Sequence, residues 1–195
     1  MLNESVRQCH GCKSYFPLQQ SLEHYQFAGI GKYGIASPEC LAAYFDILAK
    51  ENELYGYPPA HRLIVDAYSV QHPRIEEWQK KFNIEPRLVR ASIQSVPVHL
   101  IALYCAIEKQ MDLRLIAKVM DTILTNMSKH DIQFNELKSP TELGSIKVGD
   151  IQKEFFVKEC TLDEYTKLAD NWARAAWDAW KEHHATIRHW YEKYS

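Results

Sequence analysis

The stretch HRLIVDAYSVQHP, residues 61–73, decides the fold. On a helix at about 100° per residue it has one polar sector and is apolar around most of the remainder, so we predict a buried helix. Tyr68 and Gln71 fall outside the polar sector, and His72 precedes Pro73, which disfavours helical geometry at His72. An unpaired buried polar side chain costs about 1–3 kcal/mol, so these side chains need partners. The stretch is therefore predicted to form one wall of a site.

Helical patterns lie on both sides of this stretch. Before it, Ser37 is a good N-cap and Pro38 suits the first turn of a helix that we expect to run to about residue 54. After it, helices are predicted over residues 86–110, with a kink or a new start at Pro97, and over 112–129. Shorter helices are predicted at 75–82 and 150–157, and a long surface connection at 130–149.

The last long segment has the clearest pattern. Residues 161–164, Thr-Leu-Asp-Glu, form a capping box, and the helix that they open is expected to run to about Tyr191 with one apolar half. The chain is thus predicted to be all-α: a helical bundle of four to five long helices over residues 37–195. The irregular Cys-x-x-Cys segment, residues 1–36, packs against it, and residues 1–195 form a single domain.

Composition and charge exclude several classes of function. The formal net charge is −2, from well-mixed positive and negative residues, so we expect no nucleic-acid partner. The best apolar run, residues 96–107, is too short to span a bilayer, and the first residues lack the apolar core of a secretory signal. We therefore expect no membrane association and a cytoplasmic location, while the oligomeric state stays open.

The cysteines point to a metal. Cys9 and Cys12 have the spacing with which a zinc knuckle supplies two thiolates, and Gly11 gives the turn backbone freedom. Cys40 lies in the first turn of the helix that Ser37 begins, where backbone N–H groups and the helix dipole favour a thiolate. We predict a zinc site completed by a histidine. The candidates are His24, His61, His72, His183 and His184, of which we favour His72 or one of the final pair.

Two other interpretations stay open beside a structural zinc ion. In the first, His99 and either His183 or His184 hold a catalytic metal between helices, as in a metal-dependent hydrolase or transferase. The general helical layout resembles that of DinB-like metalloproteins, but Ile187 and Arg188 stand where a second histidine of their last helix is expected. In the second, Tyr68, Gln71, His72, His183 and His184 form a buried hydrogen-bond network around a small-molecule ligand or none. Dithiol exchange ranks below metal binding, because no strand and helix are predicted around the cysteine pair.

Together these motifs resemble an uncharacterised domain-of-unknown-function family of small bacterial helical proteins, over nearly the full chain. The motifs are Cys9-x-Gly11-Cys12, Ser37-Pro38-x-Cys40, the stretch from His61 to Pro73, Val98-His99-Leu100 and Trp180-x-x-His183-His184. His10 and Lys13 depart from the proline and glycine that usually follow the two cysteines in this family. The family has no established activity, so the resemblance supports the motif set and implies no reaction.

Overall fold

The computed structural model describes residues 6–18, 36–73, 86–157 and 159–195, and it confirms the predicted all-α class. The helices are α2 (Pro38–Tyr55), α3 (His61–Gln71), α5 (Pro86–Ile107), α6 (Leu113–Lys129), α7 (Val148–Val157), α8 (Leu162–Ala179) and α9 (His184–Tyr194). Two short strands, β1 (Val6–Gln8) and β2 (Tyr15–Pro17), precede them. His24 and the helix predicted at 75–82 lie outside the described residues.

The helix ends follow the signals in the sequence. The side chain of Ser37 accepts a hydrogen bond from the backbone N–H of Cys40 at 3.2 Å, which caps α2. Gly56 ends α2 in the left-handed conformation at φ 62°, and its N–H donates to the Asn52 carbonyl. The capping box at Thr161 and Glu164 opens α8 as predicted. α5 runs through Pro97 as one helix, so no new helix starts there.

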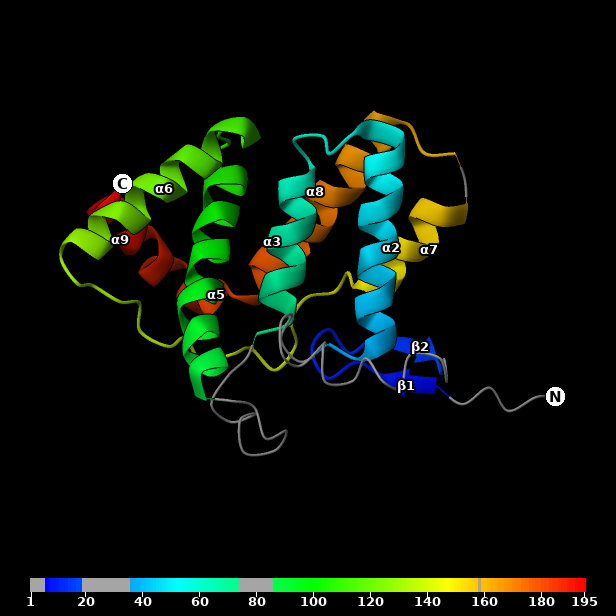
Figure 1. Ribbon diagram of the computed structural model, residues 1–195, viewed down its shortest axis with the longest axis horizontal. Coiled ribbons are helices and arrows are strands. Elements are labelled where there is room, and N and C mark those ends of the chain that lie inside the picture. Colours follow the sequence, from blue (N-terminus) through cyan, green and yellow to red (C-terminus); the bar gives the residue numbers. More distant parts are fainter. Residues whose placement is uncertain (1–5, 19–35, 74–85, 158) are drawn as a thin grey trace.

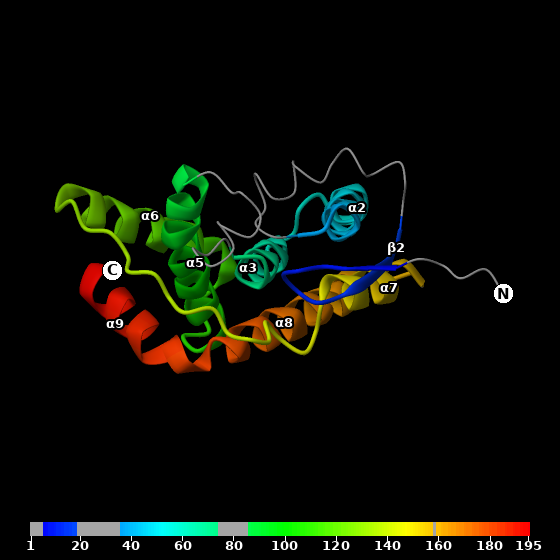
Figure 2. The same cartoon turned by 90° about the horizontal axis from the view of Figure 1, so that it is seen from below.

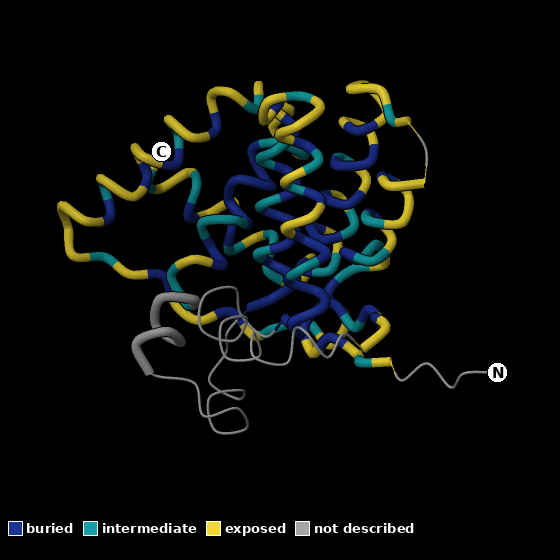
Figure 3. Tube along the Cα trace, turned by 45° about the vertical axis from the view of Figure 1, so that its right-hand side comes forward, coloured by how far each residue is buried: buried dark blue, intermediate teal, exposed yellow. Residues whose placement is uncertain are grey.

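Helix α3 lies at the centre of the arrangement. α2, α3 and α5 stand side by side (Figure 1), and α8 crosses one face of this layer (Figure 2). α3 packs against α5, α8 and α2, while α7 packs along α2, and α6 and α9 pack against α5. Buried segments gather in the middle of the molecule (Figure 3), as predicted for the 61–73 stretch. Among the described helices, none is long and apolar enough to cross a membrane.

The final helix is broken, which corrects the prediction of one helix to Tyr191. α8 ends at Ala179, a 3₁₀ turn covers Lys181–His183, and α9 then runs in a new direction against α5 and α6. The break occurs at Trp180, whose indole N–H donates to the Val70 carbonyl of α3 at 3.3 Å. Apolar periodicity continues through the break, because both helices bury tryptophan side chains, so periodicity alone could not locate it.

Residues 6–18 of the irregular N-terminal segment form a small hairpin. β1 and β2 pair antiparallel, with Arg7 opposite Phe16, and the Cys-x-x-Cys turn lies between them. The hairpin sits beside the N-terminal end of α2 (Figure 1), where Phe16 is buried. Strands of three residues are too short to give an alternating pattern, which explains why the sequence indicated an irregular segment.

Candidate metal centre

Four side chains meet at the junction of the hairpin with two helices. Cys9 and Cys12 come from the hairpin turn, Cys40 from the first turn of α2, and His72 from the residue that ends α3. Their potential ligand atoms all lie within 4.8 Å of one another. The Cys12 and Cys40 sulfur atoms are 3.8 Å apart, and the Cys40 sulfur lies 3.3 Å from Nε2 of His72. The four residues are 0–3% exposed, so the cluster is closed to solvent.

The hairpin turn is shaped to present two sulfur atoms on one side. The backbone N–H of Cys9 donates to the Ser14 carbonyl at 2.8 Å, and the N–H of Lys13 donates to the Cys9 carbonyl at 3.1 Å. Lys13 adopts a left-handed conformation at φ 63°, and its ammonium group donates to the His10 carbonyl. These bonds curl the backbone so that Cys9 and Cys12 face the end of α3.

Gly11 allows the turn to approach α3 closely. A Cβ atom at this position would lie 2.4 Å from Cδ2 of His72 and 2.7 Å from the Gln71 carbonyl oxygen. The second contact is with backbone, which cannot rotate away. A glycine at this position therefore lets the Cys-x-x-Cys turn lie directly against His72.

We expect Gly11→Ala to lower the metal affinity of the cluster and to destabilise the folded protein by about 1–3 kcal/mol, because the turn must move away from α3. Metal competition with a chromogenic chelator and urea unfolding would measure the two effects. Gly56→Ala is the matched control: a Cβ there meets nothing within 4 Å but the φ of +62° strains it, so it should lower stability without lowering metal affinity. Equal loss of metal affinity in both variants would contradict the proposed contact.

The other two ligands are also held in place by the backbone. Cys40 is fixed in the first turn of α2 by the cap that Ser37 forms. Nδ1 of His72 lies 2.7 Å from the Tyr68 carbonyl oxygen. Because a carbonyl can only accept, Nδ1 carries the proton, and Nε2 is the nitrogen directed at the sulfur atoms. A ligating histidine commonly has this second hydrogen bond, which orients the ring.

The electrostatics of the cluster favour thiolate and imidazolium charges together. Hydrogen bonds from Cys40 and Cys9 hold the pKa of the Cys12 thiol well below its usual range, although burial opposes them. Burial raises the pKa of Cys40 well above its usual range, and contacts with the other two thiols add to this effect. Burial would lower the pKa of His72, but the charge of Cys9 and hydrogen bonds with both knuckle cysteines raise it to about 10. A divalent cation would replace the shared protons.

Tyr68 and Gln71 surround the cluster without joining it. The Tyr68 ring is stacked on Tyr44 with centroids 3.8 Å apart, and its other neighbour is the His72 ring at 4.1 Å. The Gln71 amide nitrogen donates to the Ile146 carbonyl at 2.7 Å, and its oxygen accepts from the indole N–H of Trp172 at 3.0 Å. Gln71 thus ties α3 to α8 and to the long connection at 130–149.

The remaining candidate histidines lie elsewhere. Nδ1 of His61 is 2.5 Å from a carboxylate oxygen of the buried Glu51. Nδ1 of His99 contacts Asp66 at 2.7 Å, and Nε2 of His183 contacts the Lys138 carbonyl at 2.8 Å. The structure therefore does not bring His99 and His183 together into a metal site between helices.

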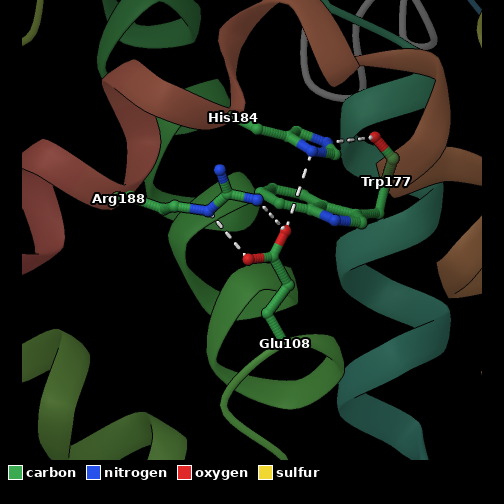
Figure 4. A network of polar contacts seen from close by, with 4 residues as sticks. All are labelled: Glu108, Trp177, His184 and Arg188. Carbon is green, nitrogen blue, oxygen red and sulfur yellow. Dashed lines mark hydrogen bonds and ion pairs between the residues drawn. The ribbon is translucent and has the colours of Figure 1, made fainter.

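His184 belongs to a different network near the break between α8 and α9 (Figure 4). Its ring stacks on Trp177 with centroids 3.7 Å apart, and Nε2 lies 3.1 Å from the Trp177 carbonyl. Its other nitrogen faces Glu108, which Arg188 binds through two hydrogen bonds of 2.7 and 2.8 Å. The break at Trp180 carries His183 and His184 away from the cysteines, so neither is among the clustered ligand atoms of the described residues.

The cysteines are all free thiols, and the two outside the cluster differ in environment. Cys105 is buried in α5, and burial raises the pKa of its thiol to about 11, as suits an inert thiol. Cys160 is half-buried before α8. The Cys9 and Cys12 pair lies in a hairpin turn and not at a helix N-terminus, which does not match the redox arrangement.

Sequence reasoning missed two residues of interest. Asp66 follows Arg62 by four residues, a spacing typical of a surface ion pair, yet it is 1% exposed and also contacts His99. Glu51 is a charged residue near the end of α2, yet it is fully buried. Each lies on a helix whose neighbours were unknown from sequence, and each carboxylate pairs with a histidine distant in the chain. No local signal in the sequence could have revealed these pairs.

Comparison with known proteins identifies a matching family. The model of a family of unknown function, DUF5946, matches residues 7–181 of the chain, which covers all four residues of the cluster. No curated protein and no solved structure matches significantly.

Proposed function

This chain belongs to DUF5946, a family of unknown function, and we propose that it is a zinc-binding helical protein whose metal is structural. The observation that carries the proposal is the convergence of Cys9, Cys12, Cys40 and His72 from three separate segments. Three thiols and an imidazole gathered in one buried place form a donor set typical of metal coordination. Coordination of a cation by all four would satisfy them at once.

Zinc fits this donor set best. Three thiolates and one imidazole form one of the common tetrahedral sets of structural zinc sites, and thiolate-rich sites disfavour magnesium or calcium. The ligands are almost completely buried, so a four-coordinate ion would have no open position for water. A closed site of this kind supports folding and does not support hydrolysis. A reducing, cytoplasmic compartment would keep the thiols available for the metal.

The proposed role of the zinc ion is to fasten the hairpin to α2 and α3. The hairpin has two strands of three residues, and isolated two-stranded hairpins are at best marginally stable. Among the described residues, it is also attached by the buried Phe16 and by an ion pair between Arg7 and Glu39 at 3.5 Å. The metal would join it to the end of the most buried helix and so fix the arrangement of α2 relative to α3.

The catalytic alternative has less support. A hydrolase or transferase site would need histidines that leave a coordination position open. The histidines predicted for such a site each pair with a different protein group, as described above. No observation favours this alternative over the cysteine cluster.

Metal analysis of purified protein tests the proposal. We expect one equivalent of zinc in the wild type by plasma mass spectrometry, and its loss in Cys12→Ser and in His72→Ala. Cys160→Ser and His183→Ala are the matched controls, because each removes the same side-chain type outside the cluster. Both controls should keep the metal. Zinc retained in both cluster variants, or lost only in His183→Ala, would overturn the proposal.

Zinc affinity should fall as the pH is lowered. The raised pKa values of Cys40 and His72 mean that both groups hold protons at neutral pH before metal is bound. Zinc binds the thiolate and the unprotonated nitrogen, so uptake must release these protons, and a higher proton concentration opposes it. Competition titrations on either side of neutrality would measure the slope. An affinity independent of pH would contradict ligation by these side chains.

A further inference from the structure

A second group of polar side chains connects α3 and α5. Asp66 is 1% exposed, and both of its carboxylate oxygens are used. Oδ1 accepts from Nδ1 of His99 at 2.7 Å, and Oδ2 accepts from Nε of Arg62 at 2.8 Å. Arg62 and His99 are therefore held against the same buried carboxylate, one from each of two different helices.

Each of these two side chains keeps part of its hydrogen-bonding capacity. Arg62 donates to Asp66 through Nε, which leaves the terminal amino groups of the guanidinium without a partner among the described residues. His99 uses Nδ1, which leaves Nε2 without one in the same part of the chain. The side chains are 27% and 21% exposed, so both can reach a ligand from solvent.

The contact with Asp66 sets the chemistry of the imidazole. A carboxylate accepts the Nδ1 proton, so in the neutral ring Nε2 carries the lone pair and acts as an acceptor. On the second oxygen of the same carboxylate, the Arg62 guanidinium offers a planar pair of donors that suits two oxygens of one anion. Together, the acceptor nitrogen of His99 and the two donor groups of Arg62 are complementary to a ligand that carries both ionised oxygens and a hydroxyl.

We propose that Arg62 and His99, positioned by Asp66, form a binding site for a phosphate-type oxyanion. The terminal amino groups of Arg62 donate to two ionised oxygens, and the phosphate hydroxyl donates to Nε2 of His99. Asp66 orients both side chains and does not touch the ligand. Since Asp66 balances the charge of Arg62, binding rests on geometry more than on net charge, and a millimolar affinity is expected for free phosphate.

A second arginine shows what is particular to this group. Arg174 donates through Nε to Asp170 at 2.7 Å, four residues before it on α8. That pair is 49% and 40% exposed, and no imidazole contacts its carboxylate in the described structure. It has the features of an ordinary surface ion pair. The difference at Arg62 is the buried carboxylate with a histidine on its second oxygen.

Phosphate titration followed by NMR tests this site. At constant ionic strength, the wild type should show saturable shifts of the His99 ring signals and of backbone amides around residues 62–66. Arg62→Lys keeps the charge but loses the fork, and should weaken binding about tenfold or more. His99→Asn can still donate to Asp66 but lacks an equivalent of Nε2. We expect this variant to weaken phosphate binding by a similar factor, measured from the backbone amide shifts because the imidazole signals are lost. Arg174→Lys is the control and should bind as the wild type does.

Sulfate provides the second arm, because it has the shape of phosphate but no hydroxyl at neutral pH. We expect it to bind more weakly than phosphate. Absence of a saturable shift in the wild type, unchanged binding in both variants, or equal affinity for sulfate would overturn the assignment. The measurement uses the folded full-length chain, and its outcome is independent of the zinc content measured for the cysteine variants.

Discussion

After zinc is removed with a chelator, the hairpin from Val6 to Pro17 is expected to lose its protection against amide hydrogen exchange, while α8 keeps its own. Structural zinc binding is worth about 10–16 kcal/mol in zinc-finger peptides at neutral pH. Burial of Phe16 contributes about 1.5–3 kcal/mol, and Arg7 adds an ion pair to the buried Glu39 at 3.5 Å. The proposed metal would therefore supply most of the free energy that holds the hairpin in place.

Hydrogen exchange followed by mass spectrometry can compare the two regions within one sample. Protection should return when zinc is added back. In Cys40→Ser the hairpin should stay unprotected even when zinc is present. Cys105→Ser, which changes a buried thiol outside the cluster, should respond normally to chelator and zinc. A hairpin that stays protected without metal would show that packing alone is sufficient and that zinc has no structural role.

Gln71→Ala should destabilise the folded protein by about 3–5 kcal/mol. The variant leaves the buried indole N–H of Trp172 without its partner, which costs about 1–3 kcal/mol, and it also removes the part-buried bond to the Ile146 carbonyl. It also creates a cavity, because the Gln71 side chain is fully buried. Because His72 is the next residue, the lost anchor should lower zinc affinity as well.

Urea unfolding followed by tryptophan fluorescence would measure the change in stability. Gln94→Ala is the matched control, because that carboxamide also makes two hydrogen bonds to a connecting segment, with the N–H and C=O of Phe134 at 2.9 and 3.0 Å. Gln94 is half-buried, so water can replace its bonds, and we expect a loss of about 1 kcal/mol. Similar losses in the two variants would contradict the role assigned to Gln71.

Much of the fold was predictable because the helix signals are local. The cap at Ser37 and the capping box at Thr161 each act within a few residues, and each appears in the structure where the sequence indicated it. The break at Trp180 was not predictable, because it depends on a hydrogen bond to α3 and on stacking of His184 over Trp177. Contacts between distant segments leave no trace in the periodicity of one helix.

The candidate site was also predictable only in part. The knuckle spacing and the helix position indicated three cysteines, and His72 was one of two favoured choices for the fourth ligand. The choice between His72 and the final pair depended on where α8 ends, which the sequence could not tell. Asp66, with its two partners on separate helices, needed the packing of α3 against α5 to be known.

The order of the ligands along the chain bears on how the protein is made. Cys12 and Cys40 are 28 residues apart in the sequence, and Cys40 and His72 are 32 residues apart. The whole donor set has thus left the ribosome before synthesis reaches α8, which begins at Leu162 and packs against α3. If the nascent chain binds zinc at that stage, the metal closes the loops from Cys12 to Cys40 and from Cys40 to His72 and fixes the end of α3. The later helices would then pack against an N-terminal half that is already assembled.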